Sequence, residues 1–157
     1  MKKSNDLVHD VLIAKFDFLA KEHNLTLVFD QINDWGYRLI YKGSNVAVSI
    51  VYEYREAYIH ILLHRLVNGE IENDPNPYQE DLPLLNIGLD WIVKVLDPSK
   101  LVKLTYDGTA DFYCKDGAFE TMAGNQAANL KNFAGSVLEG DFTVFQEVDA
   151  LVKEHYR

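Results

Sequence analysis

Apolar and polar residues alternate with two different periods along this chain of 157 residues, and the change of period predicts the order of its elements. In residues 4–23 apolar side chains return every three or four positions, which is the period of an amphipathic helix. These side chains are Leu7, Val8, Val11, Leu12, Phe16 and Leu19. Asn24 is expected to end this helix.

Between residues 25 and 72 the period falls to two, which is typical of strands that bury one face. We expect four strands and a short fifth, over residues 25–30, 37–42, 46–54, 58–67 and 70–72. Gly43-Ser44-Asn45 and Asn68-Gly69 are turn sequences in which we expect positive φ, and the second matches a type I′ hairpin. Short connections favour neighbouring antiparallel strands, so this segment predicts a meander of four or five strands.

A polar loop follows over residues 73–82, where two prolines exclude a regular helix or a central strand. Asp81 is expected to cap the next helix, with Pro83 in its first turn and Asp97-Pro98 at its end. The apolar positions within that helix repeat at the helical period.

Two more helices are expected near the end of the chain, where helical spacing returns. The first runs from about residue 119 to Gly140, and the second begins at a cap formed by Asp141 or Thr143. For residues 101–114 a hairpin around Asp107-Gly108 and a short helix both fit the pattern.

The elements are therefore grouped as one helix, a run of strands and a set of helices. Such segregation favours an α+β fold, in which an antiparallel meander sheet of four or five strands packs against an N-terminal helix and C-terminal helices. The length fits one domain, and no internal repeat or biased linker divides the chain. We expect a single domain over residues 1–157.

The charge balance excludes some classes of binding partner. The chain has 24 Asp and Glu against 15 Lys and Arg, a formal net charge of -9. This sign disfavours nucleic acids and anionic membranes as partners, because both attract clustered cations. No apolar run approaches the roughly 20 residues of a spanning helix, and the first residues lack the apolar region of a signal peptide. A cytoplasmic location is therefore expected.

The residues that could carry chemistry do not form a recognisable catalytic or cofactor motif. His60 and His64 lie about 13 Å apart if they share a strand, which is too far for one metal ion. Asp107-Gly108-Thr109 is similar to part of a phosphatase motif, but Thr105 stands where the nucleophilic carboxylate is required. The single Cys114 is interpreted as a structural thiol. We predict no catalytic residues, no metal and no cofactor.

The distribution of charge is the most informative feature of the sequence. No Lys or Arg occurs between Arg65 and Lys94, whereas carboxylates gather around the proline-containing loop. Unneutralised carboxylates attract basic partners and speed association, and an aromatic side chain among them can anchor the contact. The predicted partner-binding residues are Glu70, Glu72, Asp74, Tyr78, Glu80 and Asp81.

The first half of the chain carries a family resemblance. The run from Arg38-Leu39-Ile40-Tyr41-Lys42 through Val46-Ala47-Val48-Ser49-Ile50 to Leu62-Leu63-His64-Arg65-Leu66-Val67-Asn68-Gly69 resembles small acidic immunity proteins of bacterial polymorphic toxin systems. The resemblance implies a cytoplasmic protein that binds a toxin domain, frequently a basic nuclease, and blocks its active site. It assigns no role to any individual residue.

Three hypotheses follow from the sequence. The first is a non-enzymatic acidic protein that engages a basic protein partner, with a toxin as the specific case. The second is a hydrolase with carboxylates and His60 or His64 in a cleft on the sheet face. The third is a homo-oligomeric accessory protein with a large apolar patch. The sequence does not predict the oligomeric state.

Overall fold

Five strands form a single antiparallel sheet in chain order, β1-β2-β3-β4-β5. The computed structural model of the protein describes residues 2–103 and 117–157. The strands are β1 (Thr26–Asn33), β2 (Gly36–Lys42), β3 (Val46–Glu53), β4 (Tyr58–Arg65) and β5 (Asn86–Gly88). All four pairings are antiparallel, which confirms the predicted α+β fold with a meander sheet.

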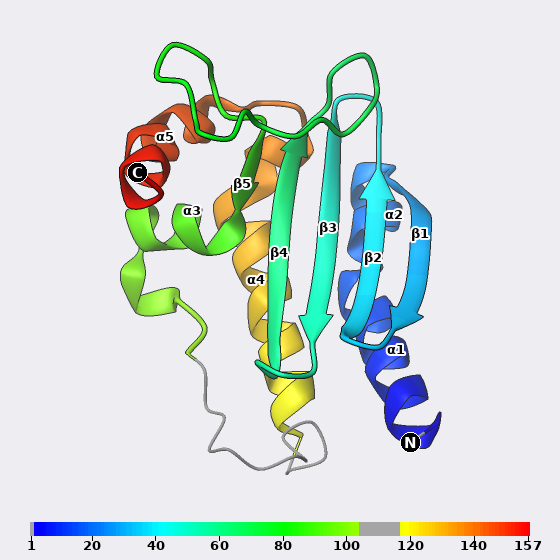
Figure 1. Ribbon diagram of the computed structural model, residues 1–157. Helices are drawn as coiled ribbons and strands as arrows, with labels where there is room; N and C mark the ends of the chain where they lie inside the picture. Colours follow the sequence, from blue (N-terminus) through cyan, green and yellow to red (C-terminus); the bar gives the residue numbers. More distant parts are fainter. Residues whose placement is uncertain (1, 104–116) are drawn as a thin grey trace.

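The helices lie behind one face of this sheet and beside its β5 edge. They are α1 (Lys2–Phe16), α2 (Phe18–His23), α3 (Leu89–Leu96), α4 (Ala118–Leu138) and α5 (Thr143–His155), with a 3-10 turn η1 (Pro98–Lys100). Figure 1 shows α1, α2 and α4 behind the sheet, and α3 and α5 beside its β5 edge. The register aligns Leu39, Ile50 and Ile61 on the covered face, where they are buried in the core.

The opposite face of the sheet carries a mixed set of side chains. The register aligns Arg38, Val51 and His60 there, and Lys42 with Ala47 and His64. No helix of the described chain crosses the face turned to the viewer in Figure 1. The alternation of the strands thus separates an apolar core from a second, chemically varied surface.

The N-terminal helix is interrupted where the sequence predicted one continuous element. α1 ends at Phe16 and α2 begins at Phe18, and both phenylalanines are buried. Residues two apart in a straight helix point about 200° away from each other. Asp17 itself keeps right-handed helical angles, φ -59° and ψ -26°, so the interruption is a local break in the helical pattern. Asn24 then ends α2, as expected, and adopts the left-handed conformation, with φ 58°.

The Asn68-Gly69 turn has the predicted conformation. Both residues have positive φ, 51° and 77°, and Val67 and Glu70 exchange backbone hydrogen bonds of 2.9 and 3.0 Å. The expected strand over residues 70–72 is wrong, because pairing stops at the bridge to Glu70. Likewise the turn at residues 43–45 forms without the positive φ we expected.

The fifth strand comes instead from residues that the sequence assigned to a helix. Asn86–Gly88 pairs with β4, so α3 begins at Leu89 and not near Asp81 and Pro83. Pairing with β4 buries Ile87 and satisfies the backbone groups that a helical turn would otherwise use. The predicted end of this helix at Asp97 is confirmed.

The C-terminal helices begin and end close to the predicted positions. α4 covers Ala118–Leu138. The expected cap of α5 by Asp141 or Thr143 is wrong, because the N-cap residue is Phe142, which makes no side-chain cap hydrogen bond; Asp141 Oδ1 accepts from the Thr143 amide (3.0 Å) and hydroxyl (2.6 Å). The alternatives for the segment around Asp107-Gly108, and Cys114, lie outside the described residues. None of the helices in residues 2–103 and 117–157 is long and apolar enough to cross a membrane.

The tight β1–β2 turn predicts a large effect of one substitution. A Cβ added to Gly36 would lie 1.7 Å from the carbonyl oxygen of Tyr52, so the strand backbone must move. We expect Gly36→Ala to lower the free energy of unfolding in urea by about 3 kcal/mol. Gly135→Ala is the control, because an added Cβ meets nothing within 4 Å in α4; it should stabilise the helix by up to about 1 kcal/mol. Equal effects of the two substitutions would contradict this packing.

Candidate functional site

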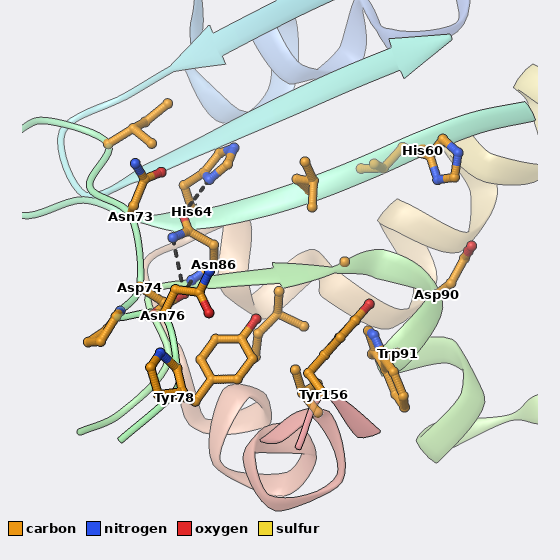
Figure 2. Close-up of a pocket in the computed structure, with 18 of the residues that line it drawn as sticks. His60, His64, Asn73, Asp74, Asn76, Tyr78, Asn86, Asp90, Trp91 and Tyr156 are labelled. Carbon is orange, nitrogen blue, oxygen red and sulfur yellow. Dashed lines mark hydrogen bonds between the residues drawn. The ribbon is translucent and has the colours of Figure 1, made fainter. Parts of the chain in front are cut away.

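A cavity of about 720 Å³ opens on the sheet face that no described helix covers. It is bounded by β4 and β5, by the segment that joins these strands, by the first turn of α3 and by the end of α5 (Figure 2). In Figure 1 the joining segment, residues 66–85, runs across the end of the sheet from β4 toward α5. The volume lies within the range of roughly 300–1,000 Å³ that is usual for ligand sites.

One end of the cavity is built on a chain of hydrogen bonds. Ser49 Oγ lies 2.7 Å from His64 Nε2, His64 Nδ1 lies 2.6 Å from Asn86 Oδ1, and Asn86 Nδ2 lies 3.1 Å from Asp74 Oδ2. Because an amide oxygen only accepts, Nδ1 of His64 carries the proton and Nε2 accepts from the Ser49 hydroxyl. This series of hydrogen bonds joins β3, β4, β5 and the segment 66–85.

Asp74 fastens the segment 66–85 to the edge of the sheet. Its carboxylate accepts from the backbone amides of Leu85 (2.7 Å) and Asn86 (3.1 Å) as well as from the Asn86 side chain. The Asn86 side chain also donates to the carbonyl oxygen of Glu72 (2.7 Å). Charge-assisted hydrogen bonds of this kind are stronger than neutral ones, so they hold the loop in one position.

A second anchor holds the far part of the same segment on α5. Lys153 has only 3% of its side chain exposed; Nζ lies 2.9 Å from Asp149 Oδ1 and donates to the carbonyl oxygen of Leu82 (2.7 Å). Asp149 Oδ2 accepts from the backbone amide of Leu84 (3.1 Å). The segment is therefore held at Asp74 and again at Leu82 and Leu84, so the cavity wall is preformed.

The environment of His64 keeps its ring neutral. Burial lowers the pKa of His64, and the positive charge of Arg38 lowers it further; the hydrogen bond with Asn86 and the charge of Asp74 act in the opposite direction. The order Ser49, His64, Asn86 is that of a nucleophile, a base and an orienting group. Ser49 is nevertheless fully buried and does not line the cavity, so its hydroxyl cannot meet a substrate there.

Aromatic side chains form the opposite wall of the cavity. The ring centroids of Tyr78 and Tyr156 lie 6.1 Å apart, and those of Trp91 and Tyr156 lie 6.4 Å apart. Burial raises the pKa of Tyr78, and the neighbouring Asp74 and Tyr156 add to this effect. We call Tyr78, Trp91 and Tyr156 the aromatic wall; Figure 2 shows it below the strands, facing His64 and Asn86.

Asp90, in the first turn of α3, places a carboxylate at the other end of the cavity. Its Oδ2 accepts from the Tyr58 hydroxyl (2.7 Å), and Nε2 of Gln126 lies 3.4 Å from Oδ1. Burial, and then the hydrogen bond to Asp90, raise the pKa of Tyr58. Within residues 7–103 and 117–157 no Lys, Arg or His nitrogen lies within 4.0 Å of this carboxylate. The donors that the described residues supply to it, Tyr58 and Gln126, are both neutral.

The structure separates the residues predicted to bind a partner. Glu70 forms an ion pair with Lys42 (3.0 Å), and Glu80 pairs with Arg157. Glu72 and Asp81 are exposed. Of the six predicted residues only Asp74 and Tyr78 line the cavity, and the carboxylate of Asp74 is engaged by amides.

Sequence reasoning missed three residues of the site. Asp90, Trp91 and Tyr156 come together at one end of the cavity, although Tyr156 is more than sixty positions away from the other two. Nothing in their local sequence indicates that they meet. Only the packing of α5 beside α3 brings them together.

His60 shows where a metal ion could be held among the described residues. Its Nε2 lies 2.8 Å from Glu56 Oε2, and ligand atoms of Glu53, Glu56 and His60 all lie within 4.8 Å of one another. Glu56 is exposed and the other two are partly exposed, and solvated carboxylates at a turn often gather without a metal. We therefore propose no metal site at these three residues.

No protein-family model, curated protein or solved structure matches this chain. Its function therefore has to be argued from the chemistry of the site, because a fold alone does not determine an activity.

Lowering the pH should weaken the fold through His64. The unfolded chain takes up a proton below the ordinary pKa of 6.5, whereas the folded protein resists it because its pKa is lowered. The contribution of His64 is thus present above pH 6.5 and is lost as the pH falls below it, by at most about 1.4 kcal/mol per pH unit. His9 acts in the opposite direction, because the hydrogen bond to Asp30 raises its pKa.

Urea unfolding of the wild type and His64→Gln, above and below pH 6.5, measures this contribution. We expect the wild type to lose its advantage over the variant as the pH falls, because glutamine does not titrate. Parallel pH profiles for the two proteins would show that His64 is not held neutral.

The anchor of the segment 66–85 on α5 predicts a contrast between two similar ion pairs. Lys153–Asp149 and Lys21–Asp17 both join residues four apart, but the lysine side chains are 3% and 77% exposed. Lys153→Met leaves Asp149 and the Leu82 carbonyl without their donor, so we expect a loss of about 2–3 kcal/mol in urea unfolding. Lys21→Met should have little effect, because exposed pairs contribute little. A Lys153→Met protein as stable as Lys21→Met would contradict the anchor.

Proposed function

We propose that the protein is a non-enzymatic binding protein, and that a basic protein partner docks on the sheet face that no described helix covers. The observation that carries the proposal is the cavity on this face, with its aromatic wall and the carboxylate of Asp90, in a chain of net charge -9. Pockets of this kind, with aromatic anchors at their centre, are where binding energy concentrates in protein interfaces.

The surface around the cavity supports a protein as the partner. Phe29, Ile40 and Leu62 lie on the same sheet face, and Ile40 and Leu62 are only partly buried. Apolar side chains next to a pocket, with charged residues around them, match the usual anatomy of an interface. The excess of carboxylates would then attract a basic partner and speed the encounter.

The acidic loop keeps a smaller role than the sequence suggested. Asp74 and Tyr78 contribute to the cavity, whereas Glu72 and Asp81 are exposed charges that do not line it. The contact surface that we propose is therefore the cavity and its rim, and not the linear loop. A toxin domain is the specific partner that the resemblance to immunity proteins suggests.

A hydrolase is the second candidate, and one observation favours it. His60 lines the cavity and hydrogen-bonds Glu56, which is the pairing of a general base with a carboxylate. A hydrolytic activity that His60→Ala abolishes and His9→Ala preserves would support this function. His9 is a suitable control because it also pairs with a carboxylate, Asp30, at a distance of 2.7 Å.

Binding of a basic partner predicts a capture that depends on salt and on the cavity. We would immobilise the wild type, Asp90→Asn and Glu147→Gln, and compare the proteins retained from a lysate of the native cells at low and high ionic strength. Both variants change the net charge by one unit, but only Asp90 lines the cavity. The wild type and Glu147→Gln should retain one basic protein at low salt and lose it at high salt, and Asp90→Asn should retain much less.

The same experiment can fail in two informative ways. Capture that does not respond to ionic strength would contradict a partner attracted by charge. Equal loss in Asp90→Asn and Glu147→Gln would mean that net charge alone matters and that the cavity is not the docking site.

A further inference from the structure

The two ends of the cavity differ in charge. At the His64 end, the charges of Arg38 and Asp74 act on the imidazole with opposite signs, because Arg38 lowers the pKa of His64 and Asp74 raises it. Nε of Arg38 is buried without a hydrogen-bond partner among the described residues. The charges of a cation and a carboxylate therefore offset each other here, so this end of the cavity has little attraction for a cationic ligand.

The end at Asp90 carries a carboxylate that has no Lys, Arg or His nitrogen of residues 7–103 and 117–157 within 4.0 Å. Tyr58 and Gln126 hold the carboxylate in place but bring no charge. A carboxylate offers about four lone-pair positions, and these two donors leave some of them free for a further donor. A cationic donor would make the stronger, charge-assisted type of hydrogen bond there.

The aromatic wall adds a second attraction for a cation. Trp91 follows Asp90 directly, and Figure 2 shows the two residues at the same end of the cavity, with Tyr156 next to Trp91. A cation over an aromatic ring is attracted by its negative face, most strongly for tryptophan. The Trp91 ring already has such a neighbour in Lys94, whose Nζ lies 5.2 Å from its centroid and which is not part of the cavity lining.

We infer that the end of the cavity formed by Asp90, Trp91 and Tyr156 holds one lysine or arginine side chain of the basic partner. The charged head pairs with Asp90, and the apolar stem lies along the rings of Trp91 and Tyr156. This inference rests on the proposed function, because it takes the docking face from there. It adds which chemical group of the partner enters the cavity.

The test uses Trp91 as a built-in reporter. The chain has two tryptophans, and Trp35 lies in the exposed β1–β2 turn, so Trp35→Phe leaves Trp91 as the only tryptophan, which can be excited selectively over the nine tyrosines. The probes are acetyl-Gly-Lys-Gly-amide and acetyl-Gly-norleucine-Gly-amide, which differ only in the terminal ammonium. We expect a saturable change of Trp91 fluorescence with the lysine peptide, and a dissociation constant at least tenfold larger for the norleucine peptide.

Three variants in the Trp35→Phe background locate the binding. Asp90→Asn should weaken binding of the lysine peptide about tenfold, the loss of one charge-assisted contact. Tyr156→Ala should weaken it several-fold, and its cost to stability should be small because this side chain is 61% exposed. Glu147→Gln removes the same charge outside the cavity and should bind like the parent. Tyr156→Ala keeps the test valid if Asp90→Asn fails to fold.

The outcomes separate the inference from the proposed function. Equal binding of both peptides, or binding that ignores Asp90→Asn and Tyr156→Ala, overturns the inference; salt-sensitive capture of a basic protein would then still support the proposed function. Cavity-dependent binding of the lysine peptide without any captured protein overturns the proposed function and the assignment to a protein side chain. In that case free lysine amide should bind as well as the peptide, which identifies a site for small amines.

Discussion

The hydrogen bonds of the Asp74 carboxylate are the constraint on which the site depends. The sheet uses one face for its core and leaves the other without a described helix, so the second face becomes concave only if the segment 66–85 is held against it. Asp74 does this by accepting from the amides of Leu85 and Asn86, at the point where β5 begins. Through Asn86 and His64 the same anchor reaches the middle of the sheet.

This network links stability and binding. A buried polar group that loses its partner costs about 1–3 kcal/mol, so a network with every member paired favours one arrangement of the loop. His64 contributes because it stays neutral and can both donate and accept. A preformed cavity also loses little conformational entropy when a ligand enters, which leaves more of the contact energy for affinity. The loop that carries the charges is thus part of a fixed surface.

Local patterns revealed the elements whose signals are local. The Asn68-Gly69 turn and the end of α2 at Asn24 follow from residues that tolerate positive φ, and the strands follow from alternation. The start of α3 could not be predicted from local sequence. Asp81 and Pro83 are residues that commonly begin a helix, whereas pairing of Asn86–Gly88 with β4 is a tertiary effect. The composition of the cavity could not be predicted for the same reason: distant cations pair with Glu70 and Glu80, and packing of α5 supplies Tyr156.

Hydrogen exchange at the backbone amides of Leu85 and Asn86 tests the central claim most directly, because both amides donate to Asp74. In the free protein we expect them to exchange as slowly as the paired amides of β4, since the loop opens only when the edge of the sheet opens. Exchange at the rate of an unstructured chain would contradict the account, because the segment 66–85 would then not be fixed and the cavity would not exist before binding.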